Sequence, residues 1–235
     1  MYILSRTIKR LRNILHPRAD CLVSYSQTGE DLIINFALYN LRIKSFTWLD
    51  VGSFHPYTLS NTAFFYERGY HGINIEPDST LFREFLSKRK RDINLNILVS
   101  NKNETIDFYI MNPSVLNTLS WREMDNYRRQ GYELVRTERK EAKTISYIVD
   151  NYHDGVFPDF LSIDAEGFDY EIIKSINWEK GRPKFICVEA LEHSPHISKP
   201  KVREEIISYL EGLRYFVFAR TPNNFILIDE TITAT

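Results

Sequence analysis

Short apolar runs alternate with amphipathic segments along most of the chain, and several of the runs end on a carboxylate. The apolar runs have the length and boundaries of buried strands and lie at 46–51, 72–75, 93–99, 159–163 and 184–188. Helical spacing of apolar residues separates most of them, at 24–41, 60–69, 78–90, 144–152, 170–176 and 201–212. The alternation predicts an α/β fold with a mostly parallel sheet.

The C-terminal part of the pattern is different. Two apolar runs, 215–219 and 224–228, flank Thr221-Pro222-Asn223 and predict an antiparallel hairpin. Residues 103–143 interrupt the alternation with a strand at 105–110, a loop at 112–119 and a charged strand at 133–143. Because an insertion between core units commonly carries function, we expect it to form a wall or lid on the ligand-bearing side of the sheet.

Residues 1–20 form a basic amphipathic segment that precedes one domain at 21–235. Apolar residues recur at helical spacing between basic ones: Leu4, Ile8, Leu11 and Leu15 with Arg6, Lys9, Arg10 and Arg12. One interpretation is a helix at 1–16 that contacts anionic lipid at a membrane surface. The other is a helix that packs on the domain or on a partner subunit of a homo-oligomer.

The composition is that of a soluble globular domain. Hydrophobic residues make up 43% and charged residues 26% of 235 residues. The net charge of −1 argues against a nucleic-acid binder that relies on a basic surface. The two cysteines, Cys21 and Cys187, are too few for a disulfide framework and favour reduced thiols in a cytoplasmic protein. The basic cluster 88–91 has the pattern of a solvated helix face.

Candidate chemistry begins where the first two strands end. The first strand ends in Asp50, followed after one residue by Gly52 and Ser53, and the second ends in Glu76-Pro77, 26 residues after Asp50. This spacing fits one β-α-β unit, whose strands present their carboxyl ends to a ligand. Two such acids suit a nucleoside, because the later one can accept hydrogen bonds from ribose hydroxyls.

These segments, in this order, resemble the FkbM-type methyltransferases, a branch of the class I Rossmann-like enzymes that use S-adenosylmethionine. The resemblance covers about residues 24 to 228 and rests on 26–31, 50–53, 60–62, 75–77, 99–101, 164–167 and 188–189. It implies strand order 3-2-1-4-5 with the C-terminal hairpin beside it. The chain departs from many class I enzymes in having a single glycine, Gly52, in the first loop.

The resemblance also implies a methyl-donor site. Its expected residues are Asp50, Gly52, Ser53, Glu76, Pro77, Ser100 and Asn101. Ser100 and Asn101 follow the third predicted strand, where they could hydrogen-bond an adenine edge. Glu30 and Asp31 have two interpretations: they cap the helix that Thr28 opens, or their turn lies over the cofactor.

Acidic residues also crowd the ends of the fourth and fifth strands. Asp164, Glu166, Glu189 and His193 converge there if the sheet has the expected order. Clustered carboxylates can take a proton from an attacking hydroxyl, cap the following helix, or bind a divalent metal. We therefore take Asp164, Glu189 and His193 as catalytic candidates. Mg²⁺ held by Asp164, Glu166 and Glu189 is the open alternative.

The expected reaction is transfer of a methyl group from S-adenosylmethionine to a hydroxyl of a sugar or glycan-type metabolite, as the resemblance implies. Two other interpretations stay open. A degenerate methyltransferase fold could serve as a binding domain, in keeping with the glycine-poor first loop. A nicotinamide-dependent oxidoreductase is disfavoured, because the phosphate-binding glycine pattern is missing after the first strand.

Overall fold

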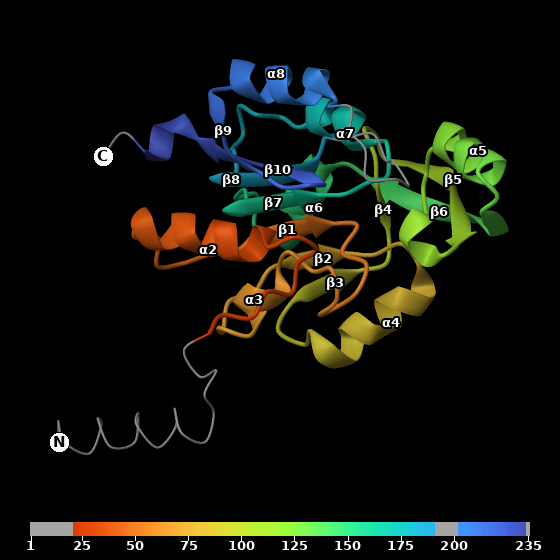
Figure 1. The fold of residues 1–235 in the computed structure, drawn as a ribbon, viewed down its shortest axis with the longest axis horizontal. Coiled ribbons are helices and arrows are strands. Elements are labelled where there is room, and N and C mark those ends of the chain that lie inside the picture. Colours follow the sequence, from red (N-terminus) through yellow and green to blue (C-terminus); the bar gives the residue numbers. More distant parts are fainter. Residues whose placement is uncertain (1–20, 191–201, 234–235) are drawn as a thin grey trace.

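The computed structural model describes residues 21–190 and 202–233, and in this part of the chain a seven-stranded sheet forms the centre of the molecule (Figure 1). The strand order is β3-β2-β1-β7-β8-β10-β9. The parallel strands are β1 (Trp48–Val51), β2 (Ile73–Ile75), β3 (Ile93–Leu95), β7 (Phe160–Ile163) and β8 (Phe185–Glu189). β10 (Asn224–Asp229) runs antiparallel to both β8 and β9 (Tyr215–Arg220). The predicted α/β fold with a C-terminal antiparallel hairpin is confirmed.

Helices cover both faces of this sheet, and the two faces differ in chemistry. One face packs against α2 (Glu30–Asn40) and α3 (Ala63–Tyr66) through an aromatic core that includes Phe46, Trp48, Phe64, Phe65, Phe160 and Phe185. The other packs against α6 (Ile145–Tyr152), α7 (Asp169–Ser175) and α8 (Glu204–Gly212) through aliphatic residues such as Leu49, Val51, Leu161, Ile163, Ile186 and Val188. Alternate residues of each strand point to opposite faces, so β1 supplies Trp48 and Asp50 to the aromatic side.

Two further elements, a helix and a short 3-10 turn, belong to the main layer. α4 (Ser79–Lys88) joins β2 to β3, and its N-terminus is capped by Asp78, whose carboxylate accepts the backbone N–H of Thr80 at 2.7 Å. The 3-10 turn η2 (Glu230–Ile232) follows β10. α2 begins at Glu30, later than predicted, with Gly29 in the cap position and no side-chain cap, so the expected cap by Thr28 is wrong.

A second sheet has the strand order β4-β6-β5. Its strands come between β3 and β7 in the sequence. It contains β4 (Leu98–Val99), β5 (Glu104–Asn112) and β6 (Glu133–Lys143), with η1 (Ser114–Leu116) and α5 (Trp121–Arg129) between the last two. The single predicted strand at 93–99 is wrong. Its first residues pair with β2, but Leu98 and Val99 pair parallel with β6, so the chain changes sheets around Asn96.

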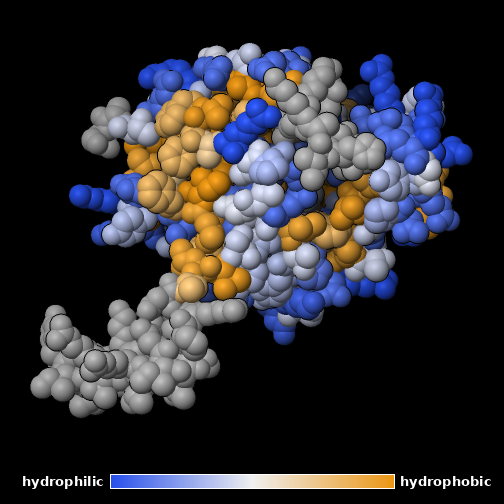
Figure 2. All heavy atoms as spheres, viewed as in Figure 1, coloured by the Kyte–Doolittle hydropathy of each residue, from blue (hydrophilic) through white to orange (hydrophobic). Residues whose placement is uncertain are grey.

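The surface carries an apolar area on the side where α2 and β9 lie (Figure 2). Phe36 and Tyr39 of α2 are 61% and 82% exposed, and Phe36 stacks on Phe218 of β9 with ring centroids 6.5 Å apart. Exposed apolar patches often mark contact surfaces. The predicted amphipathic segment 1–16 lies outside the described residues. Among the helices that are described, none has the length and hydropathy to cross a bilayer.

Candidate functional site

The turn after β1 is clamped to the end of β2. The backbone N–H groups of Gly52 and Ser53 both donate to the carbonyl of Ile75, at 3.1 and 3.0 Å. The Ser53 hydroxyl donates to the Asp50 carbonyl at 2.8 Å and accepts the Ile75 N–H at 3.1 Å. Ser53 therefore shapes the site by holding two strand ends together.

Gly52 is required at its position for two reasons. Its φ is +75°, a conformation that side chains disfavour, and a Cβ atom there would lie 2.0 Å from the carbonyl oxygen of Asp164. The backbone N–H of Asp164 also donates to the Val51 carbonyl at 3.0 Å. The turns after β1 and β7 thus touch. We call the ends of β1 and β2 the donor side, where the methyl donor is expected, and the ends of β7 and β8 the acceptor side; this contact brings the two sides together.

Glu76 lies at the end of β2, where both of its carboxylate oxygens accept backbone N–H groups. Oε2 accepts from Phe54 at 2.8 Å and Oε1 from Asp78 at 2.7 Å. Burial raises the pKa of Glu76 to about 8, although these bonds lower it. Each oxygen keeps a second lone pair. The carboxylate is therefore held rigidly with acceptor capacity remaining.

Asn96 supports this strand end and was not predicted. Its side-chain amide donates to the carbonyls of Glu76 at 2.8 Å and Pro77 at 3.0 Å. It occupies the place, just after β3, where the sequence pattern put the middle of a strand. Its role could not be predicted from the sequence, because it depends on the chain leaving the main sheet at this residue.

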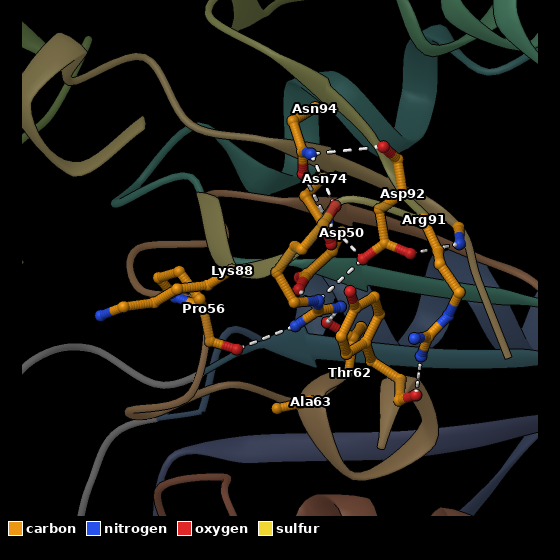
Figure 3. A network of polar contacts seen from close by, with 12 residues as sticks. Asp50, Pro56, Thr62, Ala63, Asn74, Lys88, Arg91, Asp92 and Asn94 are labelled. Carbon is orange, nitrogen blue, oxygen red and sulfur yellow. Dashed lines mark hydrogen bonds and ion pairs between the residues drawn. The ribbon is translucent and has the colours of Figure 1, made fainter. Parts of the chain in front are cut away.

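Asp50 is buried and points into the protein. Its carboxylate accepts the Thr62 hydroxyl at 3.0 Å on the aromatic face of the sheet, within the polar network drawn in Figure 3. Burial raises the pKa of Asp50 to about 6, against the hydrogen bonds from Ser162 and Thr62 and the charge of Arg89, which lower it. In this structure Asp50 connects β1 to the network beneath the turn.

Four other predicted cofactor residues have partners within the protein. Ser100 follows β4 in the second sheet, where its N–H donates to the Lys143 carbonyl at 3.0 Å, and Asn101 is exposed. Hydrogen bonds from Thr28, Asn224 and Thr221 outweigh the effect of burial and lower the pKa of Glu30 to about 2. Asp31 accepts the Tyr25 N–H and the Ser24 hydroxyl, both at 2.7 Å. Contact of these residues with a cofactor stays a prediction.

Asp164 and Glu189 lie at the ends of the neighbouring strands β7 and β8. Solvent reaches the Asp164 side chain, yet the surrounding protein removes much of its hydration, and this effect together with the charges of Asp169 and Asp50 raises its pKa to about 7. Burial and the charges of Asp164 and Glu166 raise the pKa of Glu189 well above its ordinary value. The two acids share one negative environment. His193 lies outside the described residues.

The turn from the end of β7 to α7 is held by hydrogen bonds and an ion pair. Asp169 accepts the N–H groups of Ala165 at 2.8 Å and Gly167 at 3.3 Å, and pairs with Arg203 at 3.3 Å. Glu166 accepts the Tyr127 hydroxyl of α5 at 2.8 Å. Burial and the charge of Asp164 raise the pKa of Glu166 well above its ordinary value.

No metal site is formed by these acids. Within residues 21–190 and 202–233, no group of three or more His, Cys, Asp or Glu side chains is placed to hold an ion. The alternative of Mg²⁺ on Asp164, Glu166 and Glu189 therefore lacks a ligand set here.

The segment between β5 and β6 bridges the two groups of strand ends. On one side the Asn117 amide donates to the Asp78 carboxylate at 3.1 Å, next to Glu76. On the other, the Thr118 hydroxyl donates to the Glu166 carbonyl at 2.9 Å. The segment thus borders both the donor side and the acceptor side of the site.

Comparison with known proteins decides the family. A family model described as the Methyltransferase FkbM domain matches residues 50–217, from Asp50 in β1 to Val217 in β9, which is more than half of the chain. The chain belongs to this family. The resemblance predicted from the motifs is confirmed, and the two touching strand ends of this FkbM-family chain both lie inside the matched range.

Other comparisons add less. No curated protein matches the chain. A crystal structure of Methyltransferase FkbM from Methylobacillus flagellatus KT is similar, with 14% sequence identity and a TM-score of 0.45. The similarity covers 94% of this chain, which spans only 60% of that protein.

Proposed function

We propose that this FkbM-family chain is an active enzyme that transfers a methyl group from S-adenosylmethionine to a hydroxyl of a sugar or glycan-type metabolite. The observation that supports a nucleoside-containing donor is Glu76, a buried carboxylate fixed by Phe54 and Asp78 with acceptor capacity left for ribose hydroxyls. The two unpaired cysteines support a cytoplasmic location. The substrate class follows from the family resemblance.

The acceptor side supplies a place for the proton. S-adenosylmethionine contributes an electrophilic methyl group on a sulfonium. A hydroxyl is a poor nucleophile at neutral pH, so it must be positioned closely and give up its proton as it attacks. Asp164 is our candidate for the base, since its pKa of about 7 leaves a large ionised fraction at neutral pH and its turn contacts Gly52. Glu189 and His193 are the next candidates.

Calorimetry with S-adenosylmethionine, S-adenosylhomocysteine and NAD tests the donor. The wild-type protein should bind the first two and not NAD. Glu76→Ala should weaken their binding at least about tenfold, because two hydrogen bonds to the ribose hydroxyls, worth about 0.5–1.5 kcal/mol each, would be lost. The exposed Glu211 of α8 offers a control, and Glu211→Ala should bind normally.

Three outcomes would contradict parts of the proposal. Unchanged affinity in Glu76→Ala would remove the ribose assignment, and tight NAD binding would favour an oxidoreductase. The acceptor is tested by mass spectrometry of nucleotide- and lipid-linked glycans incubated with the protein and a labelled methyl donor. Donor binding without label transfer to any of them would favour a degenerate binding domain.

A further inference from the structure

Arg89 is a fully buried cation directly after α4. Its side chain is 0% exposed, although it lies in a basic cluster whose other members, Lys88, Lys90 and Arg91, are exposed. The guanidinium lies 4.6 Å from the centroid of the Tyr66 ring and 5.5 Å from that of Trp48. Burying an arginine is costly unless its donors are satisfied, so its partners show what it holds.

The donors of Arg89 reach three parts of the chain, and Figure 3 labels the residues that accept them, Pro56, Thr62 and Asp92. Nε donates to the Asp92 carboxylate at 2.7 Å, Nη1 to the Pro56 carbonyl at 2.9 Å, and Nη2 to the Thr62 hydroxyl at 3.1 Å. Pro56 ends the turn whose Phe54 N–H binds Glu76. The Arg89 side chain therefore anchors the end of the turn whose first part orients Glu76, the proposed ribose-binding acid.

The other two partners extend the anchor to the neighbouring strands. The Thr62 hydroxyl donates a hydrogen bond to the Asp50 carboxylate at 3.0 Å, which fixes the end of β1. Asp92 accepts the N–H of Gly72 at 3.1 Å and the Asn74 amide at 2.9 Å, which fixes β2. Asn74 in turn accepts the indole N–H of Trp48 at 3.1 Å. The network joins β1, β2 and the turn through one guanidinium.

We infer that Arg89 is a positioning residue for the methyl donor: it holds the turn at 54–56 and the hydroxyl of Thr62 so that Glu76 and the β1 turn keep the geometry that binds the nucleoside. The inference rests on the proposed function. A planar fork with donors in three directions is needed at this point, and a lysine ammonium cannot reproduce it. Charge alone would not be enough.

A purely structural role makes a different prediction, and the protein contains a matched control. Arg182 also pairs with a buried acid, Asp229, at 2.5 Å, donates to a backbone carbonyl, that of Leu213, at 2.7 Å, and lies 4.5 Å from a tyrosine ring centroid. Its partners Asp229 and Leu213 lie outside the turns after β1, β2, β7 and β8 that form the site, whereas the partners of Arg89 include the turn after β1. If Arg89 only stabilises the fold, the two arginines should behave alike.

The experiment compares Arg89→Lys with Arg182→Lys in the full chain. Both should lower Tm, but only Arg89→Lys should weaken binding of S-adenosylhomocysteine in calorimetry, by about tenfold, the effect of losing one good hydrogen bond from a charged donor. In turnover assays KM for the methyl donor should rise while kcat at saturating donor stays within about threefold, the pattern of lost uniform binding.

Thr62 provides a second, smaller test that holds if Arg89→Lys does not fold. Thr62→Val removes the hydroxyl that links Arg89 to Asp50 and should weaken S-adenosylhomocysteine binding, whereas Thr62→Ser keeps the hydroxyl and should restore it. Equal affinity in all variants, or equal weakening by Arg182→Lys, would overturn the role of Arg89 alone. Absence of binding by the wild-type protein would instead overturn the proposed function and the inference with it.

Discussion

The donor side and the acceptor side of this site both carry carboxylates with raised pKa values, but the groups that act on these carboxylates differ. After burial itself, the strongest influences on the pKa of Asp50 are the hydrogen bonds from Ser162 and Thr62, and the strongest on Glu76 is the N–H of Asp78. On the acceptor side the next influence is negative charge. Asp169 acts on Asp164, and Asp164 acts on Glu166 and on Glu189.

This contrast indicates that the donor side is a prearranged binding site and that the carboxylates of the acceptor side are suited to take up protons. Carboxylates that already receive hydrogen bonds from the protein are held in place before a ligand arrives. Carboxylates that repel one another hold protons more tightly and gain most from a ligand that brings hydroxyl donors. A polyol therefore suits the acceptor side better than an anionic group does, in agreement with the proposed substrate class.

The largest expected effect comes from removing the candidate base. Asp164→Asn should lower turnover by about 10²–10⁴ while binding of S-adenosylhomocysteine stays normal, because only proton transfer from the acceptor is lost. Single-turnover kinetics and calorimetry on the same preparation measure the two properties. EDTA should change neither of them.

Three results would contradict this prediction. Near-normal turnover in Asp164→Asn would move the chemistry away from β7, towards Glu189 or the segment around Asn117. Loss of donor binding together with turnover would mean that Asp164 belongs to the donor side. Activity that EDTA abolishes and Mg²⁺ restores would revive the metal alternative.

The strand ends of the donor side could be predicted from the sequence because their signals are local. Asp50, Gly52 and Glu76 stand at the ends of apolar runs, and a parallel sheet brings such ends to one edge whatever else the chain does. The same reasoning placed Asp164 and Glu189 on neighbouring strands, as the pairing of β7 with β8 shows.

What could not be predicted depends on distant contacts. The cluster 88–91 reads as solvated, yet Arg89 is buried because Pro56, Thr62 and Asp92 happen to meet it. The helix α5 was missed because its sequence is mostly polar and only Met124 and Tyr127 are buried. The change of sheet at Asn96 follows from the pairing of β4 with β6, a partner more than 40 residues away along the chain.

A smaller effect should appear in the pH dependence. A base must be ionised to take a proton, so with saturating donor kcat/KM for the acceptor should fall about tenfold per pH unit below the pKa of Asp164, about 7, and level off above it. Stopped assays from pH 5.5 to 9 would measure the profile. A flat profile across pH 7 would contradict the role of Asp164, and saturating donor keeps the titration of Glu76 out of the measurement.

The smallest effect, in Tm, compares acids whose pKa values are shifted in opposite directions. The pKa of Asp164 is raised in the folded protein from 3.8 to about 7, so its ionised form reduces stability above pH 7, and this cost disappears as the pH falls to about 4. Asp164→Asn should therefore raise Tm at pH 8 and leave it unchanged near pH 4. Because solvent screens this exposed side chain, we expect a rise of about 2–4 °C, which corresponds to about 1 kcal/mol in a protein of this size. The pKa of Glu30 is lowered to about 2.

For Glu30 the effect of ionisation on stability has the opposite sign, because its pKa is lowered in the folded protein. Its stabilising effect is present above its ordinary pKa of 4.5 and is lost only as the pH falls through about 2. Glu30→Gln should therefore lower Tm at pH 8, because the amide cannot accept all the hydrogen bonds that Thr28, Thr221 and Asn224 donate to the carboxylate. Thermal unfolding of both variants at pH 4 and pH 8 measures the contrast. If Asp164→Asn lowered Tm at pH 8 as Glu30→Gln does, the acceptor side would be held by hydrogen bonds like the donor side, and its carboxylates would not be poised for proton transfer.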